Sequence, residues 1–482
     1  MDTAEFREIS HYIVDLLADY FDTVEDRSLV PDVEPRFLEE IFSEPVPRDP
    51  TPAADVIREV EEKLLPYCTH VNHPGYFGLI TPSPTPIGVL GDFLASALNQ
   101  NIGAYSIGPA AVAIERQTVR WLMDLVGYDE RAGGSLTSGG MMANFVGLKL
   151  ARDRMSGDRA QHEGVRDRWA VYVSEERHVS LDKAVDAIGI GREALRALPT
   201  DDQFRIRLDA LEAAIEKDKE NGTRPMCLIG LAGTTNTGAI DPLADLRRIA
   251  SREDAWLHVD AAYGGGMLLS KKHPGLLEGI ELADSVTMDP HKWFFAPLDA
   301  GALLVKDGAR LTASFGIEPA YLKDAQDVNN ERFNYYVHSF EQSRRFRSLK
   351  VWMSFKRYGT AQIGRWIDAN VAQAERLFEL CEGELDFHAA VRPAMSAICI
   401  RYEPEGLGEQ QLGELHQRAV QRIQRAGRFW ISTTLLKGRT FFRINPVNFR
   451  TRLEHMDKLF AALREECVLA RATLEDNDSS IY

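Results

Sequence analysis

The sequence is poor in cysteine and has no long apolar run. Its five cysteines are odd in number and widely spaced along 482 residues, and no two of them show the C-x-x-C spacing of a zinc or redox motif. We therefore expect neither a disulfide framework nor a metal site. No run of roughly 18 apolar residues occurs, which argues against a membrane-spanning helix. The first residues carry acids where a signal peptide carries bases, so we expect a soluble, cytoplasmic protein with no membrane partner.

Positive charge is scarce as well. Lysine and arginine number 56 against 72 aspartates and glutamates, which gives a formal net charge of −16. This balance argues against nucleic acid and acidic membrane surfaces as main partners. The charge of a small-molecule substrate stays open, because a pocket can differ from the surface as a whole. The hydrophobic fraction of 44% is that of an ordinary globular chain, long enough here for two or three domains.

The first part of the chain reads as helical. An amphipathic pattern covers 4–21, prolines then break the chain, and shorter helical patterns follow at 36–43 and 53–65. This stretch is too thin to form a core by itself. We therefore predict that residues 1–75 are an N-terminal helical dimerisation segment that packs on a partner subunit.

From residue 76 to 360 helical patterns alternate with short apolar strands. The predicted strands are 169–174, 226–232, 255–261, 284–288 and 301–305. Strands separated by helices predict an α/β domain with a mostly parallel sheet covered by helices on both faces. A long helix follows at 344–380. Residues 361–482 are predicted to form a small C-terminal α+β domain, with strands near 395–402 and 439–444 and a helix at 451–470.

Two of the predicted strands end in side chains suited to catalysis. The run Trp-Leu-His-Val-Asp-Ala-Ala-Tyr (256–263) carries Asp260, and the run that ends in Pro-His-Lys-Trp (290–293) carries Lys292. In parallel sheets ligands bind at the carboxyl ends of the strands. A lysine amine bonds to the aldehyde of pyridoxal phosphate, and a carboxylate pairs with its pyridine nitrogen. Most lysines are solvated surface charges, but this setting predicts a pyridoxal-phosphate enzyme.

A glycine-rich turn offers a place for the phosphate group. The segment Gly-Ser-Leu-Thr-Ser-Gly-Gly-Met-Met-Ala-Asn (134–144) runs into a helical pattern at 145–152, and free N–H groups at a helix N-terminus suit an anion. By itself such a turn is equally an ordinary helix cap. Beside Lys292 and Asp260 the phosphate interpretation is favoured. The residues placed there are Thr137, Ser138, Gly139, Gly140 and Asn144.

Three further residues stand at strand ends. His178 follows the strand at 169–174, where a flat imidazole could stack on the pyridine ring. Thr234 and Thr235 end another strand, and for them turn capping and cofactor contact are equally open. Together these residues fit the breaking of a bond at the substrate α-carbon, with the electrons flowing into a ring whose nitrogen stays protonated. Decarboxylation, transamination, racemisation and aldol cleavage all fit that description.

Longer motifs point to one family. They include His-Pro-Gly-Tyr-Phe (73–77), His-Val-Asp-Ala-Ala-Tyr (258–263), Pro-His-Lys-Trp (290–293) and Arg-Arg-Phe-Arg-Ser-Leu-Lys (344–350). With them nearly the whole chain resembles the group II pyridoxal-phosphate-dependent amino-acid decarboxylases, of the aromatic-L-amino-acid decarboxylase type. The resemblance implies a fold type I enzyme with a seven-stranded, mostly parallel sheet. It also implies a homodimer with active sites at the subunit interface.

The resemblance assigns roles to residues around the cofactor. Lys292 would bond to it, Asp260 would bind its nitrogen and His178 would stack on its ring. His291 would help to place substrate and cofactor. Thr235, Gly139, Gly140, Met141 and Asp289 complete the predicted cofactor contacts.

Two of those positions depart from the family. Met141 replaces a small hydroxyl residue that is common there, so the phosphate would rely on backbone amides. Asp289 stands where animal members have an asparagine near the phosphate. Because two anions repel, direct contact of Asp289 with the phosphate stays open.

A polar loop at roughly 322–338 would reach a neighbouring subunit's active site. In the family a loop tyrosine protonates the carbanion left when carbon dioxide departs, and a gapless register places it at Tyr335, with Tyr336 beside it. Tyr321 belongs to a different, structural motif. A phenylalanine at the loop position, as in related aldehyde synthases, would favour oxidative deamination. Tyrosine favours simple decarboxylation.

The substrate side is the least determined. Leu79, Ile80 and Gly103 fall where aromatic members carry ring side chains, and Ser343 falls where serine accompanies phenolic substrates. Arg443 resembles a position that binds a substrate carboxylate in the glutamate branch, and a structural salt bridge is equally open for it.

The resulting hypothesis is a carboxy-lyase acting on an L-amino acid, with tyrosine, dihydroxyphenylalanine or tryptophan preferred. Alternatives are a decarboxylase of an acidic or diamino acid (glutamate, aspartate, cysteine sulfinate or 2,4-diaminobutyrate), an aminotransferase, and a catalytically silent scaffold protein.

Overall fold

The computed structural model describes residues 1–317 and 331–479. The chain forms two compact units. The larger unit holds the described parts of Ile80–Ala372 together with Val391–Ile398, and the smaller unit holds Met1–Leu79, Gln373–Ala390 and the chain from Cys399 onward. The three-part division drawn from the sequence stays a prediction. The predicted loop at 322–338 lies partly, and Tyr321 entirely, outside the described residues.

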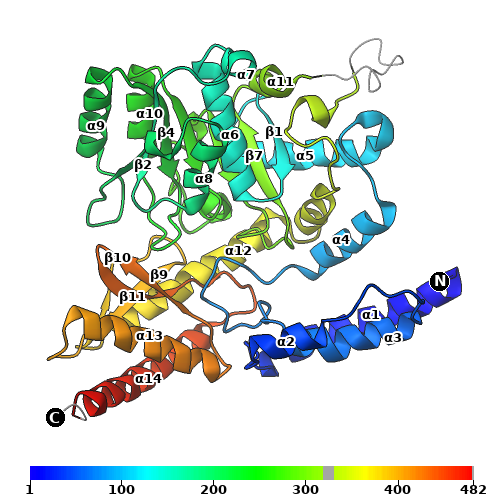
Figure 1. The fold of residues 1–482 in the computed structure, drawn as a ribbon, viewed down its shortest axis with the longest axis vertical. Coiled ribbons are helices and arrows are strands. Elements are labelled where there is room, and N and C mark those ends of the chain that lie inside the picture. Colours follow the sequence, from blue (N-terminus) through cyan, green and yellow to red (C-terminus); the bar gives the residue numbers. More distant parts are fainter. Residues whose placement is uncertain (318–330, 480–482) are drawn as a thin grey trace. The chain divides into compact units, whose positions relative to one another are not determined.

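A seven-stranded sheet forms the centre of the larger unit, in the order β1-β7-β6-β5-β4-β2-β3 (Figure 1). Its strands are β1 Gly133–Thr137, β2 Trp169–Ser174, β3 Leu195–Leu198, β4 Arg224–Leu231, β5 Trp256–Asp260, β6 Ser285–Met288 and β7 Gly301–Val305. Only β7 runs opposite to its two neighbours, so β1 and β6 on either side of it share one direction with the other strands. The mostly parallel α/β sheet predicted from the sequence is therefore confirmed.

Helices cover both faces of this sheet. The helices of the larger unit are α4 Pro86–Leu98, α5 Pro109–Val126, α6 Gly140–Met155, α7 Ala160–Glu163, α8 Val179–Ala187, α9 Leu208–Glu220, α10 Leu243–Arg252, α11 Ala309–Phe315 and the first part of α12 Ser348–Glu382. Successive residues of strand β4 point to opposite faces of the sheet and so contact different helices. Ile229 packs into a fully buried cluster with Val146 of α6 and Leu181 of α8, whereas the neighbouring Gly230 faces Leu243 of α10. In Figure 1, α6 and α8 lie beside each other over the sheet.

The smaller unit joins the N-terminal helices to a second sheet. Its elements are α1 Thr3–Thr23, α2 Pro35–Ile41, α3 Ala53–Glu59, β8 Phe387–Ala389, β9 Ile398–Tyr402, α13 Glu409–Arg425, β10 Ser432–Leu436, β11 Arg439–Ile444 and α14 Leu453–Ser479. The four strands are ordered β10-β11-β9-β8. The helix and strand patterns predicted at 4–21, 395–402 and 439–444 correspond to α1, β9 and β11.

The sequence patterns missed some elements and boundaries. Strand β1 was read as part of a turn because its five residues, Gly-Gly-Ser-Leu-Thr, hold two glycines and no β-branched run. Helix α6 begins at Gly140, five residues earlier than predicted. The long helix predicted at 344–380 begins at Ser348 and is interrupted at Gly359, whose φ of 65° is left-handed. Among the described helices none is long and apolar enough to span a bilayer.

Candidate active site

The predicted site residues meet at one edge of the larger sheet. Strands β1, β2, β4, β5 and β6 all end there, because they run in the same direction. Asp260 is the last residue of β5 and pairs in register with Leu231 of β4 and Thr287 of β6. Asp289 directly follows β6, and Gly139 follows β1 by two residues. This is the edge at which doubly wound sheets bind ligands.

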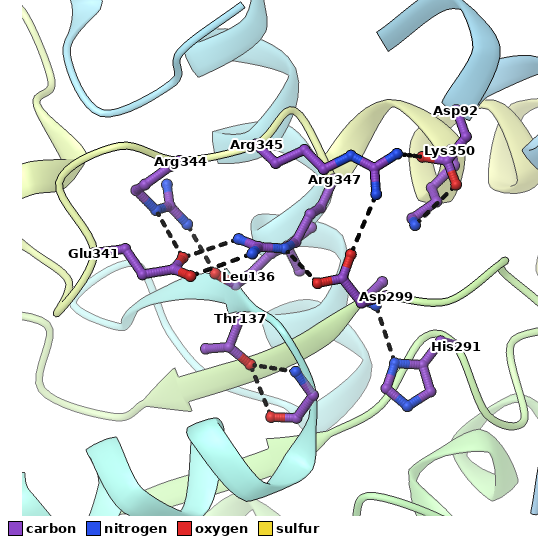
Figure 2. A network of polar contacts seen from close by, with 12 residues as sticks. Asp92, Leu136, Thr137, His291, Asp299, Glu341, Arg344, Arg345, Arg347 and Lys350 are labelled. Carbon is purple, nitrogen blue, oxygen red and sulfur yellow. Dashed lines mark hydrogen bonds and ion pairs between the residues drawn. The ribbon is translucent and has the colours of Figure 1, made fainter. Parts of the chain in front are cut away.

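The phosphate turn lies against the start of β7. A side chain on Gly301 would come within 2.5 Å of the backbone of Gly139, so this close approach needs glycine at 301. Gly139 has a φ of +151°, which disfavours any other residue there. The hydroxyl of Thr137 donates to the carbonyl of Gly139 at 3.1 Å and fixes the turn (Figure 2). No side chain caps the N-terminus of α6 in the described chain, so its first N–H groups are available to an anion.

Lys292 lies beside Asp289. Its Nζ is 3.2 Å from Asp289 Oδ2, and the carboxylate is 2% exposed. The same oxygen lies close to Gly140, where an added Cβ would be 2.8 Å from it. Asp289 Oδ1 is buried and has no hydrogen-bond partner among the described residues. Asp289 thus holds the lysine amine next to the helix N-terminus.

His291 is held by the main chain at the start of β7. Its Nδ1 accepts a hydrogen bond from the Ala300 N–H at 3.0 Å, as Figure 2 shows, so the proton of the neutral ring is on Nε2. Burial lowers the pKa of His291, and the charge of Lys292 lowers it further against the opposing effect of Asp289. A neutral imidazole with one N–H pointing away from β7 follows from this arrangement.

His178 is fixed by the helix that it caps. Its Nδ1 accepts a hydrogen bond from the Ser180 N–H at 3.2 Å at the start of α8. Desolvation lowers the pKa of His178, and the nearby charge of Lys292 lowers it further. The ring is therefore neutral at pH 7, which suits stacking on an aromatic ring.

These residues surround a cavity of about 370 Å³. Its described lining includes Lys292, Asp260, His178, His291, Asp289, Gly139, Gly140, Met141 and Thr235. These nine predicted cofactor residues, together with Ser138, Asn144 and Thr234, are thus brought to one cavity, whereas Thr137 is not part of its described lining. A lysine amine, a carboxylate opposite it and a glycine-lined helix N-terminus match the aldehyde, pyridine nitrogen and phosphate of pyridoxal phosphate. A cavity with these groups, at the carboxyl edge of a mostly parallel sheet, is what a pyridoxal-phosphate enzyme of fold type I requires.

Comparison with known proteins agrees with this class. A family model described as the pyridoxal-dependent decarboxylase conserved domain matches residues 35–403. An aromatic-L-amino-acid decarboxylase of Bacillus atrophaeus is 31% identical over 465 residues, covering 96% of this chain and 96% of the relative. A phenylacetaldehyde synthase of Arabidopsis thaliana is 30% identical, covering 97% of this chain and 96% of that relative. The crystal structure of Oryza sativa TDC with PLP and tryptamine has a TM-score of 0.91 at 27% identity, covering 97% of this chain and 98% of that one.

The chain belongs to the pyridoxal-dependent decarboxylase family. It is a group II carboxy-lyase that uses pyridoxal phosphate to decarboxylate an amino acid. The individual roles of Lys292, Asp260 and the α6 N-terminus stay predictions.

The predicted substrate residues are not part of the described lining of this cavity. In the larger unit Gly103 accepts a hydrogen bond from the Tyr336 N–H at 3.0 Å, Ser343 is exposed and Ile80 is partly buried, and none of them is part of the described cavity lining. In the smaller unit Leu79 is 50% exposed, and the buried Arg443 donates from Nη1 to the Gly78 carbonyl. Substrate contact by these residues stays a prediction.

Tyr335 also lies outside the described lining of the cavity. Its side chain is 1% exposed, in an apolar cluster with Ile102 of the larger unit. Its ring packs edge-on against Phe333 at 4.9 Å, and the guanidinium carbon of Arg344 lies 4.2 Å from the ring centroid. The proton-donor role of Tyr335 stays a prediction.

Other lining residues were missed or misplaced by the sequence patterns. Glu176, Ser180, Tyr263 and Leu298 line the cavity, although none of them was predicted as a site residue. Asn144, predicted beside the phosphate, instead donates to Asp260 Oδ2 at 2.8 Å from one turn inside α6. The helical period carries residue 144 away from the N-terminus of the helix toward β5.

A charged network braces the wall next to His291 (Figure 2). Arg347 pairs with Asp299 at 3.0 Å and with Glu341 at 2.9 Å, directly before the Ala300 N–H that holds His291. Arg344 donates to the carbonyl of Leu136 in β1 at 2.8 Å. The segment that carries the Arg-Arg-Phe-Arg motif thereby ties β1 to the chain that leads into β7.

Within this network Arg344→Met is expected to lower the free energy of unfolding by about 3–5 kcal/mol. Arg344 and Glu115 form an ion pair at 2.5 Å and both side chains are 0% exposed, so the substitution would leave a buried carboxylate uncompensated. Urea unfolding of the cofactor-free protein measures the effect. The adjacent Arg345→Ala is the matched control, because Arg345 is 45% exposed and its surface pairs contribute about 1 kcal/mol or less. Equal shifts for the two variants would contradict the argument.

Proposed function

We propose that this decarboxylase acts on an aromatic L-amino acid and releases the corresponding arylalkylamine. The observation that carries this proposal is the charge of the cavity. Among its described lining residues Lys292 is the one lysine or arginine, whereas Glu176, Asp260 and Asp289 are acids. A substrate with an acidic side chain would meet repulsion and no second cation. The similarity to the Bacillus atrophaeus aromatic-L-amino-acid decarboxylase supports the same choice.

The roles of the chain's own groups follow from their positions. When bound, pyridoxal phosphate supplies the electron sink for the bond that breaks at the α-carbon. Lys292 would hold the cofactor and release it to the substrate amine, and the α6 N-terminus would hold the phosphate. Asp260 would hold a proton on the pyridine nitrogen. His178, neutral and fixed by Ser180, would cover the ring face and exclude water from it.

The experiment is a product analysis by mass spectrometry. The purified protein, loaded with pyridoxal phosphate, is incubated with a panel of L-amino acids. Tyramine, dopamine or tryptamine would support the proposal and rank the substrates. An amine from glutamate, aspartate or cysteine sulfinate would refute the charge argument while the decarboxylase chemistry stands. One observation favours a diamino acid as the substrate. The carboxylate of Glu176 in the cavity lining could receive the second ammonium group of such a substrate.

We further propose a homodimer whose subunits share active sites. Two helices leave large apolar side chains in water, and a partner surface would cover them. They are Phe6, Tyr12 and Val14 on α1, and Leu90, Phe93, Leu94 and Leu98 on α4, each between 46% and 57% exposed. The family's loop, which here would carry Tyr335, would then serve the neighbouring subunit's cavity.

Mixed dimers test this sharing. A dimer of one Lys292→Ala subunit and one Tyr335→Phe subunit, isolated through two different tags, is expected to form amine at about half the wild-type rate. One of its two sites then combines the intact lysine with the intact tyrosine. If each subunit supplies its own tyrosine, neither site is intact and amine formation stays at the level of the two single variants. A monomer with full activity would contradict the dimer itself.

A cytoplasmic location is proposed on chemical grounds. All five cysteines lie in the described residues, and no disulfide joins any two of them. Cysteines that stay reduced fit a reducing compartment.

A further inference from the structure

Behind Asp260 a chain of buried hydrogen bonds runs through α6, β5 and β6. Asn144 Nδ2 donates to Asp260 Oδ2 at 2.8 Å, and Asn144 Oδ1 lies 3.0 Å from His258 Nε2. On the other side of the ring His258 Nδ1 lies 2.7 Å from Ser285 Oγ. The Trp256 indole N–H donates to the same oxygen at 2.8 Å. Of these residues, Asp260 and Asn144 are part of the described cavity lining.

The proton positions along this chain follow from its two ends. An ionised Asp260 only accepts, so the Asn144 amide must turn its NH₂ group toward it. Its carbonyl oxygen then faces His258 and requires a proton on Nε2. His258 Nδ1 is left as an acceptor for the Ser285 hydroxyl, whose oxygen receives the Trp256 N–H. From Trp256 to Asn144 each residue therefore donates toward Asp260, and a single tautomer of His258 satisfies the chain. The Asn144 amide also donates to Ser180 Oγ at 3.1 Å.

Burial keeps the histidine neutral and in place. His258 is 0% exposed, and its burial lowers its pKa to about 4 against the opposing effect of Asp260. Helix α6 passes close above the ring, where a side chain at Gly147 would come within 2.8 Å of His258 Cε1. An imidazole packed this tightly cannot change its orientation without moving the helix.

We propose that Asn144 and His258 are positioning residues that aim the Asp260 carboxylate at the pyridine nitrogen of the cofactor. Asp260 Oδ2 is held by Asn144, and Oδ1 accepts the Ala262 N–H at 3.1 Å, so the carboxylate is fixed at both oxygens. Such fixed donors favour one rotamer of the carboxylate, as outer partners do for metal ligands. The inference concerns the cofactor and holds whichever amino acid is the substrate.

The test compares two probes that differ at one atom. Pyridoxal phosphate and its 1-deaza analogue, which has carbon in place of the pyridine nitrogen, are each titrated into the cofactor-free protein and followed by absorbance. The ratio of the two dissociation constants reports how strongly the protein recognises the nitrogen. A general loss of structure weakens both probes equally and leaves the ratio unchanged. Asp260→Ala sets the limit at which the ratio approaches one.

A matched pair of variants isolates the donor at Nε2. His258→Gln can keep an N–H near the position of Nε2, whereas His258→Asn reaches only the position of Nδ1 and loses it. We expect the ratio to fall about tenfold toward one in His258→Asn and in Asn144→Leu, and to be retained in His258→Gln. Thr287→Val removes a second partner of the same nitrogen, since the Thr287 hydroxyl lies 3.3 Å from His258 Nε2, and it is expected to retain the ratio because Asn144 Oδ1 at 3.0 Å still receives that proton.

Three results would overturn the proposal. One is a wild-type ratio that survives in Asn144→Leu and His258→Asn. Another is an equal loss in His258→Gln and His258→Asn, which would assign the effect to packing alone. The third is a ratio unaffected by Asp260→Ala, since Asp260 would then not recognise the nitrogen at all.

Discussion

Lys292→Ala is expected to remove covalent cofactor binding and to lower amine formation by at least about a thousandfold. Lys292 is the one lysine in the described lining of the cavity, and no other amine there could bond to the aldehyde. Borohydride reduction followed by peptide mass spectrometry checks the first part: the wild-type peptide that contains Lys292 gains the mass of the reduced cofactor. Product analysis with the substrate found in the panel checks the second.

The control for this prediction is Lys217→Ala. Lys217 is exposed on α9, away from the described cavity lining, and its loss is expected to leave both labelling and amine formation unchanged. Thermal unfolding of both variants separates loss of chemistry from loss of fold. Labelling of a different lysine at full stoichiometry in Lys292→Ala, with amine formation retained, would remove Lys292 from its role.

The strands that carry the candidate cofactor residues could be predicted from the sequence because their signals are local. Strand 169–174 has the predicted bounds, and the runs that end in Asp260 and Lys292 are apolar, short and buried as their patterns indicated. In a parallel sheet such strands end at one edge whatever their order. The strand order, with β7 reversed between β1 and β6, was not needed to bring the two residues together.

The supporting contacts could not be predicted in the same way. His258 stands in the same motif as Asp260. The two residues are two positions apart in one strand, so their side chains lie on the same face of the sheet. The partners of His258, however, come from α6 and β6. Asn144 was assigned to the phosphate from its closeness in sequence to Gly139, although the helical turn between them directs it to Asp260.

Tyr335→Phe is expected to lower amine formation by about a hundredfold and to raise aldehyde formation, as loss of a general acid predicts. The phenol of Tyr335 is buried, which raises its pKa well above the usual value, so the hydroxyl keeps its proton at neutral pH and has a proton to donate. Phenylalanine retains the ring that packs on Phe333 and Arg344, so the fold should be preserved. Mass spectrometry of amine and aldehyde from one reaction measures both changes.

Tyr336→Phe is the matched control, because it removes the same hydroxyl one residue further along the same short helical turn, Tyr335–Val337. If Tyr335 is the donor, its substitution alone shifts the products. A shift in Tyr336→Phe alone would move the donor by one residue and confirm the ambiguity of register in the motif. If neither variant changes the products, the hydroxyls of this turn take no part in proton transfer, and the burial of Tyr335 in its apolar cluster is then its whole role. The ratio of aldehyde to amine thus decides between a catalytic and a packing function for a side chain that the cavity itself does not contain.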